Sequence, residues 1–250
     1  MIQVNVRHNF QVVGNPVRDK PNQRSTTTAG WGHVELGTAR EHLFRECFTH
    51  LFTFQVYKQI LDTKYSVFDN PVILERFRLI VGSLVILFEP ISADSLACLL
   101  QGTSSVSIIS TLRQLRPVFT FGGSTSLIRT PHSSFHNFLT DEKSCPSPFF
   151  IDRQQQHAML AERCFKVMTN LFNQTRALSE IYIRPGLVYG LCYWDSHLHT
   201  SSFDKAPFLL EQLRVFVKSQ LKQWLCALFW SSALAHAILS VKNAHSWVVS

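Results

Sequence analysis

The chain has 250 residues, and its 46% hydrophobic and 16% charged content excludes a protein that is disordered throughout. The formal net charge of +7 would suit a polyanion-binding surface, but Lys and Arg are scattered singly along the chain. Nucleic acid is therefore not an expected partner. The six cysteines form no Cys-x-x-Cys pair, so we expect neither a zinc site nor a disulfide framework.

Residues 1–38 are rich in polar side chains, include the run Ser25–Thr28, and show no sustained hydrophobic period. We expect this segment to be a poorly ordered leader. It lacks a basic region followed by a continuous apolar stretch, so it does not resemble a secretory signal, and we expect the protein in the cytoplasm.

Residues 39–141 carry the apolar spacing of helices. Apolar side chains recur at helical intervals over Ala39–Leu61 and again over Val72–Phe88. Ser92 suits the N-cap of a helix that runs to Leu100, because its hydroxyl can accept a bond from an unpaired backbone N–H. A third helix is expected to begin after a cap at Ser104 or Ser105. Its predicted buried stripe consists of Val106, Ile109, Leu112 and Leu115.

A short β-hairpin is predicted after these helices. Val118–Phe121 and Leu127–Arg129 are β-prone runs on either side of the flexible tip Gly122–Ser124. Three helices followed by a hairpin describe a winged helix. Thr130 and Pro131 then suit the cap and first position of another helix.

The second half of the chain is predicted to be all helical. Residues 142–154 form a linker stiffened by the prolines of Cys145–Pro148, and residues 155–250 form a helical arm. The predicted fold is mainly α, with a winged-helix subdomain that carries a short β-hairpin wing, followed by an all-helical subdomain.

One segment of the arm approaches the length of a membrane span. Gln223–Val241 contains no Asp, Glu, Lys or Arg. Its polar residues Ser231, Ser232 and His236 are costly in hydrocarbon, so a buried core helix is the preferred interpretation and a membrane is not an expected partner.

Several blocks of the sequence point to one family. They are Arg76–Leu100, Thr111–Leu115 and Ile128–Asp141, with weaker support from Val56–Leu61, His157–Cys164, Tyr193–Leu198 and Trp224–Leu225. Over about Val56 to Trp247, the chain resembles the C-terminal part of a basidiomycete NACHT-domain protein of the signal-transducing STAND NTPase class. This part comprises the winged helix and the helical arm that follows it.

The resemblance implies a role for His132. In related STAND modules a histidine just after the wing, in a Met-His-Asp motif, contacts the β-phosphate of bound ADP, and His132 holds a similar place. Pro131 and Ser133 replace the Met and Asp of that motif. His132 is thus the nucleotide-sensing candidate, and a histidine that packs at a helix start is the alternative.

The catalytic core of such a protein is not in this sequence. There is no Gly-x-x-x-x-Gly-Lys-[Ser/Thr] loop to hold phosphates, and Gly122–Ser124 lacks the required lysine. We therefore expect no enzymatic activity and no cofactor in this chain, with ADP or ATP bound only in a complete NACHT module. The expected partners are other proteins or the missing NACHT core. The function implied is a nucleotide-dependent switch in fungal innate immunity or nonself recognition.

A winged-helix DNA-binding protein is the alternative function. Its recognition helix would run from Ser105 to Arg116, and only Arg113 and Arg116 would supply positive charge to the groove. Attachment to a membrane through Gln223–Val241 is a third possibility.

Overall fold

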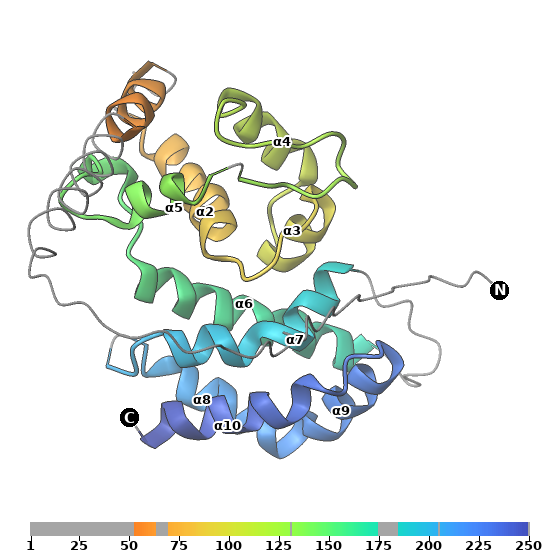
Figure 1. Cartoon of the computed structure of the whole chain (residues 1–250). Helices are drawn as coiled ribbons and strands as arrows, with labels where there is room; N and C mark the ends of the chain where they lie inside the picture. Colours follow the sequence, from red (N-terminus) through yellow and green to blue (C-terminus); the bar gives the residue numbers. More distant parts are fainter. Residues whose placement is uncertain (1–52, 64–69, 131, 175–184, 205, 250) are drawn as a thin grey trace, which may run out of the picture. The chain divides into compact units, whose positions relative to one another are not determined.

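A computed structural model describes residues 53–63, 70–130, 132–174, 185–204 and 206–249 (Figure 1). Contacts group Glu46–Ser250 into one compact unit. The described part is mainly helical and contains no β-strand, so the mainly α class is confirmed at that level. The predicted leader 1–38 and the start of the next region, residues 39–52, lie outside the described residues.

Three of the N-terminal helices begin at the caps that their sequences favour. A helix covers residues 53–63. Helix α2 (Pro71–Ile86) follows Asn70, whose side chain accepts a bond from Val72 N–H. Helix α3 (Ala93–Leu100) begins after Ser92, and α4 (Ser105–Gln114) begins after Ser104. Each serine hydroxyl accepts a backbone N–H of the first turn, so both predicted caps are confirmed.

The buried stripe of α4 differs from the predicted one. Ile108, Leu112 and Leu115 are fully buried, whereas Val106 is 76% exposed and Ile109 is half-buried. Thr111 takes an inward position, which its hydroxyl tolerates because it donates to Ser107 O. The core-facing stripe is therefore set by Ile108 and its i+4 and i+7 neighbours, and the prediction for Val106 was wrong.

The segment expected to form a hairpin contains two isolated antiparallel bridges. Thr120 pairs with Arg129, and Ser92, which lies between α2 and α3, pairs with Leu127. The tip closes locally, because Ser126 Oγ accepts Gly122 N–H. The Ser124 carbonyl accepts Asp94 N–H, from the first turn of α3. These bonds connect the segment to α3 and leave its two arms paired only at one point.

Helix α5 (Ser133–Thr140) begins later than predicted. His132 is the residue before the helix, with an extended backbone at φ −138° and ψ 131°. The helix thus begins at Ser133, so the predicted Thr130 cap was wrong, while Pro131 lies outside the described residues. The expected buried side chains, Phe135, Phe138 and Leu139, are all in the core.

The proline-containing stretch after α5 packs against the N-terminal helices. Ser147–Phe149 forms a short 3₁₀ turn whose Phe149 ring contacts Phe77 of α2 edge-to-face at 5.1 Å. Ile151 N–H donates to Leu139 O. The stretch that was predicted to be a linker therefore contributes three buried side chains, Cys145, Phe149 and Ile151, to the core.

The arm contains α6 (Arg153–Gln174), α7 (Pro185–Thr200), α8 (Phe208–Val215), α9 (Leu221–Trp230) and α10 (His236–Val249). A π-helical turn, Phe216–Gln220, joins α8 to α9. Helices α6 and α7 run side by side, α10 packs on α7, and α3 contacts the start of α7 (Figure 1). A Cβ on Gly186 would lie 2.3 Å from Ser95 O, so the close approach of α3 and α7 requires glycine there.

Gln223–Val241 is not the single buried helix that was predicted. Helix α9 ends at Trp230 and α10 begins at His236, and Ser232 between them has a left-handed φ of 57°. Within the described segments, no individual helix has the length and apolar content needed to cross a bilayer. Helices α3 and α4 reach that threshold only as a pair, with a bend of 118° between them.

Candidate functional site

His132 lies exposed at the start of α5. Its Nδ1 is 2.9 Å from Ser134 Oγ, which in turn is 2.8 Å from Tyr57 Oη. Ser134 and Tyr57 are buried, so this chain of contacts fixes the imidazole on one side. Among the described residues no hydrogen bond involves His132 Nε2. The residue as a whole is exposed, so a ligand can reach the ring.

The first turn of α5 has no side-chain cap. Its free N–H groups and the positive end of the helix dipole favour an anionic group in this place. A cavity of about 300 Å³ opens beside the turn, and its lining includes Arg129, Ser133 and His136. The segment Ile128–Asp141 thus gathers several donors suited to phosphate, although Glu89 on the opposite wall of the cavity adds a negative charge.

The two arginines of the alternative DNA-binding hypothesis are both exposed. Arg113 lies in the last turn of α4, whereas Arg116 lies beyond its end, with its guanidinium 5.9 Å from the centre of the Phe121 ring. Thr111, expected to face a groove, is buried. The surface offered by α4 is therefore smaller and less polar than its sequence indicates.

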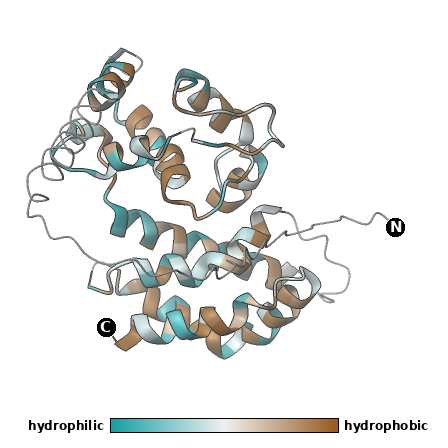
Figure 2. Ribbon diagram, in the orientation of Figure 1, coloured by the Kyte–Doolittle hydropathy of each residue, from teal (hydrophilic) through white to brown (hydrophobic). Residues whose placement is uncertain are grey.

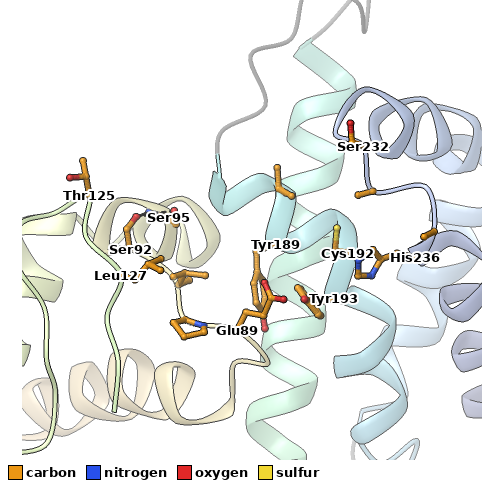
Figure 3. Close-up of a pocket in the computed structure, with 15 residues that line it drawn as sticks. Glu89, Ser92, Ser95, Thr125, Leu127, Tyr189, Cys192, Tyr193, Ser232 and His236 are labelled. Carbon is orange, nitrogen blue, oxygen red and sulfur yellow. Dashed lines mark hydrogen bonds between the residues drawn. The ribbon is translucent and has the colours of Figure 1, made fainter. Parts of the chain in front are cut away.

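A larger cavity, of about 510 Å³, has two walls (Figure 3). One is formed by the loop after α2 and the start of α3, and the other by α7 and the turn before α10. Glu89 is the one charged residue among those that line it, and it faces the rings of Tyr189 and Tyr193. Burial, together with a hydrogen bond to Glu89, raises the pKa of Tyr193. His236 contacts Tyr193 edge-to-face at 5.8 Å. One carboxylate among aromatic rings suits a positively charged group.

A buried histidine pair lies behind the aromatic wall of this cavity. His157 Nδ1 of α6 is 2.8 Å from His197 Nδ1 of α7, and His197 Nε2 is 2.8 Å from Tyr189 Oη. Phe88 N–H donates to the same Tyr189 oxygen. Burial lowers the pKa of His157 to about 4 and the pKa of His197 well below its usual value. Both rings are therefore neutral at physiological pH.

One arrangement of protons gives every contact in this network a donor and an acceptor. The Tyr189 hydroxyl donates to His197 Nε2, and the Nδ1–H of His197 donates to His157 Nδ1. The network joins α6, α7 and the end of α2. Sequence reasoning treated His197 as a surface or packing residue and did not pair it with His157, forty positions away. His157 shares the apolar face of α6 with Ala161 and Cys164, and this helical spacing could have indicated that the histidine is buried.

The cavity lining does not supply an activated nucleophile. Burial raises the pKa of the Cys192 thiol to about 11, so at neutral pH it is a thiol and not a reactive thiolate. Within the described ranges, no cluster of three or more His, Cys, Asp or Glu side chains is arranged to hold a metal ion. His136 contacts Asn137 Oδ1 through its Nδ1. The lining is suited to binding more than to covalent catalysis.

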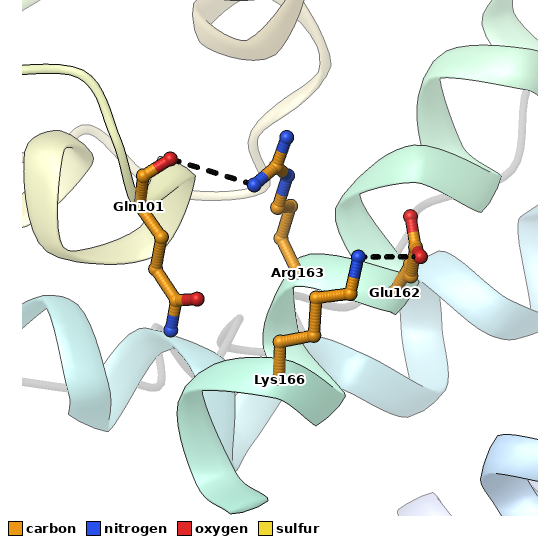
Figure 4. Close-up of polar contacts among 4 residues, drawn as sticks. All are labelled: Gln101, Glu162, Arg163 and Lys166. Atoms are coloured by element: carbon orange, nitrogen blue, oxygen red, sulfur yellow. Dashed lines mark hydrogen bonds and ion pairs between the residues drawn. The ribbon is translucent and has the colours of Figure 1, made fainter. Parts of the chain in front are cut away.

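A second polar contact between the two halves of the chain lies near the end of α3. Arg163 of α6 donates through Nη1 to Gln101 O at 3.5 Å, while Lys166 pairs with Glu162 one helical turn away (Figure 4). Gln101 has a left-handed φ of 46°, which turns its carbonyl toward α6. This contact and the histidine network fix α6 against α2 and α3 at separate points.

The chain was compared with models of protein families, with curated proteins and with solved structures. None of them matches. The NACHT resemblance therefore depends on the residues of this chain and on their arrangement.

Proposed function

We propose that this chain is the winged-helix and helical-arm portion of a NACHT-type STAND regulator, and that it acts as a non-catalytic switch and interaction element. In an intact module, the winged helix would close on ADP in the resting state and move on nucleotide exchange. The phosphate-binding loop would come from a separate core.

The order of the elements is the observation that carries this proposal. A winged helix has a helix, a short strand, two helices and then a hairpin, and the short strand pairs with the returning arm of the hairpin. Ser92, between α2 and α3, pairs with Leu127, while Thr120 pairs with Arg129. The two bridges occur at the positions where that topology requires strand pairing. This agreement supports a winged helix whose sheet is reduced to single bridges.

The environment of His132 supports its role as the nucleotide sensor. The residue lies three positions after Arg129 of the second bridge, it is exposed, and the first turn of α5 follows it without a side-chain cap. A histidine can donate to a phosphate oxygen, and more strongly when protonated. The described residues at the site include no loop to enclose a triphosphate, and the proposal assigns that part to a separate core.

Calorimetric titration tests the claim that this chain does not bind nucleotide on its own. We expect ADP and ATP to give no binding in the submicromolar range when they are titrated into the purified chain. Submicromolar ADP affinity that disappears in His132→Ala would contradict the claim that nucleotide binding requires a separate core.

DNA binding is the second candidate, and the exposure of both Arg113 and Arg116 favours it. If it holds, duplex DNA binds with a steep salt dependence, and changing both arginines to alanine abolishes the binding. Unchanged affinity in the Arg113→Ala, Arg116→Ala variant excludes α4 as a recognition helix.

A further inference from the structure

The turn between α9 and α10 carries a group of exposed apolar side chains. We call this group the tip surface: Phe229, Trp230, Leu234, Ile238 and Val241. Phe229 is 62% exposed, Trp230 58% and Ile238 71%. Figure 2 shows apolar residues recurring along both helices. Single exposed apolar residues are ordinary, but five of them on either side of one turn, with the ring centres of Phe229 and Trp230 5.6 Å apart, indicate a surface that is covered in use.

Helix α10 buries the polar Ser240 and exposes the apolar Ile238 and Val241. Ser240 Oγ donates to Asp195 Oδ1 at 2.9 Å, and Asn243 Nδ2 donates to Asp195 Oδ2 at 2.7 Å. Asp195 is 1% exposed, so these bonds satisfy a buried carboxylate and fix the rotation of α10 about its axis. Ile238 and Val241 are thereby held on the outer face. Their exposure is a consequence of the fold.

The charges on α9 and α10 have a single sign, whereas Glu89, after α2, lines the cavity that the turn between these helices also lines. After Glu211 the sequence contains no Asp or Glu, but it contains Arg214, Lys218, Lys222 and Lys242. Lys222 and Lys242 are exposed, one on each helix. With a rise of 1.5 Å per residue, Lys222 lies about 12 Å before the end of α9 and Lys242 about 9 Å after the start of α10. Both helices thus have an apolar end followed by a positive charge.

This arrangement fits an anionic lipid surface better than a second copy of the chain. Two copies that met through their tip surfaces would bring the lysines of both copies together, and like charges would oppose the contact. A membrane interface accepts Trp and Phe at the boundary of the acyl chains and places Lys among the phosphates. The depth of an interfacial element, about 5–10 Å, is close to the distance between the apolar ends and the lysines.

We propose that the tip surface inserts into the interfacial layer of a membrane that contains anionic lipids, with Lys222 and Lys242 at the level of the phosphates. Neither helix crosses the bilayer in this arrangement. The inference does not depend on the proposed NACHT function, because it uses only the arm.

Flotation with lipid vesicles tests the proposal on the purified chain. We expect binding to vesicles of phosphatidylcholine with phosphatidylserine, little binding to phosphatidylcholine alone, and weaker binding at high salt. Changing Phe229 and Trp230 together to Ser should weaken binding at least about tenfold. The Lys222→Gln, Lys242→Gln variant should weaken it about thirtyfold, from the attraction of each lysine to an anionic surface. All four side chains are exposed, so circular dichroism should show unchanged folding.

A matched control changes exposed apolar residues elsewhere. Val106→Ser with Phe208→Ser should leave vesicle binding unchanged, because both residues lie outside the tip surface. Tryptophan emission provides a second measurement. Trp194, Trp224 and Trp247 are buried, so a blue shift on addition of vesicles should be lost in Trp230→Phe and retained in Trp31→Phe.

Three results would overturn the proposal. The first is the absence of vesicle binding by the folded chain, and the second is equal binding to neutral and anionic vesicles. The third is a dimer in light scattering that Phe229→Ser and Trp230→Ser dissociate, without any effect of these changes on lipid binding. That outcome would assign the tip surface to contacts between copies.

Discussion

His132 and His197 show how differently the two halves of the molecule use the same side chain. His132 is exposed beside an uncapped helix start, with Nδ1 held by Ser134 and no hydrogen bond to Nε2 from the described residues. His197 is fully buried, and its ring nitrogens contact His157 of α6 and Tyr189 of its own helix, α7. The first arrangement is suited to a ligand and adds little to stability. The second fixes helices together and is not accessible to a ligand.

Removing the buried carboxylate of the arm should have the largest effect on stability. Asp195→Ala leaves Ser240 and Asn243 without their acceptor and creates a small void. We expect the free energy of unfolding in urea to fall by about 2–4 kcal/mol. Asp204→Ala, at an exposed position, is the control and should change it by less than about 0.5 kcal/mol. Equal stability of the two variants would contradict the structural role of Asp195.

A methyl group at Gly186 should disrupt the contact between the two halves. The new Cβ would lie 2.3 Å from the Ser95 carbonyl oxygen, which is backbone and cannot move aside alone. We expect Gly186→Ala to lower the free energy of unfolding by about 1–3 kcal/mol. At Gly190 the nearest atom would be 3.8 Å away, and Gly190→Ala should be neutral or stabilising by about 0.5–1 kcal/mol. A tolerated Gly186→Ala would show that α3 and α7 do not approach so closely.

The buried histidine pair should make stability depend on pH. Both pKa values are lowered in the folded chain, so between pH 6.5 and about 4 the unfolded chain binds more protons than the folded one. Stability is therefore complete above pH 6.5 and decreases as the pH falls. Each histidine should contribute up to about 1.4 kcal/mol per pH unit in that range.

Urea unfolding at pH 7.0 and pH 5.5 measures this effect. His157→Gln should reduce the pH dependence, whereas His199→Gln, on the exposed end of α7, should retain it. If the His157→Gln variant keeps the full pH dependence, the neutral histidine network is not its source.

The smallest effect on stability is expected at His132. His132→Ala removes one contact to Ser134 at an exposed position, so the free energy of unfolding should change by no more than about 0.5 kcal/mol. A loss of more than about 2 kcal/mol would indicate that the side chain maintains the fold and is not reserved for a ligand.

The helices could be predicted from the sequence where local signals determined them. Ser92 and Ser104 were recognisable caps because the bond from each hydroxyl lies within its own turn. The start of α5 and the break after Trp230 were missed. The latter depends on a left-handed Ser232, a conformation that serine rarely adopts and that no local pattern announces.

Contacts between distant segments were not predictable from spacing alone. The pairing of His157 with His197 and the bonds from α10 to Asp195 each join different helices. The bonds to Asp195 hold Ile238 and Val241 on the outer face of α10. In the sequence alone, these apolar residues suggested a core helix. His132 could be singled out by its position after the wing, whereas the cavity that Glu89 and Tyr193 line required the assembled fold.

ADP titration of a longer product is the most direct test of the central claim, that this chain is the switch portion of a NACHT module. Transcripts that cover this region should be read for an upstream, in-frame Walker A loop, and the encoded protein should be purified with and without His132→Ala. We expect the longer protein to bind ADP and His132→Ala to weaken that binding at least about tenfold. The absence of such a loop from every transcript, or ADP affinity that His132→Ala leaves unchanged, would contradict the claim.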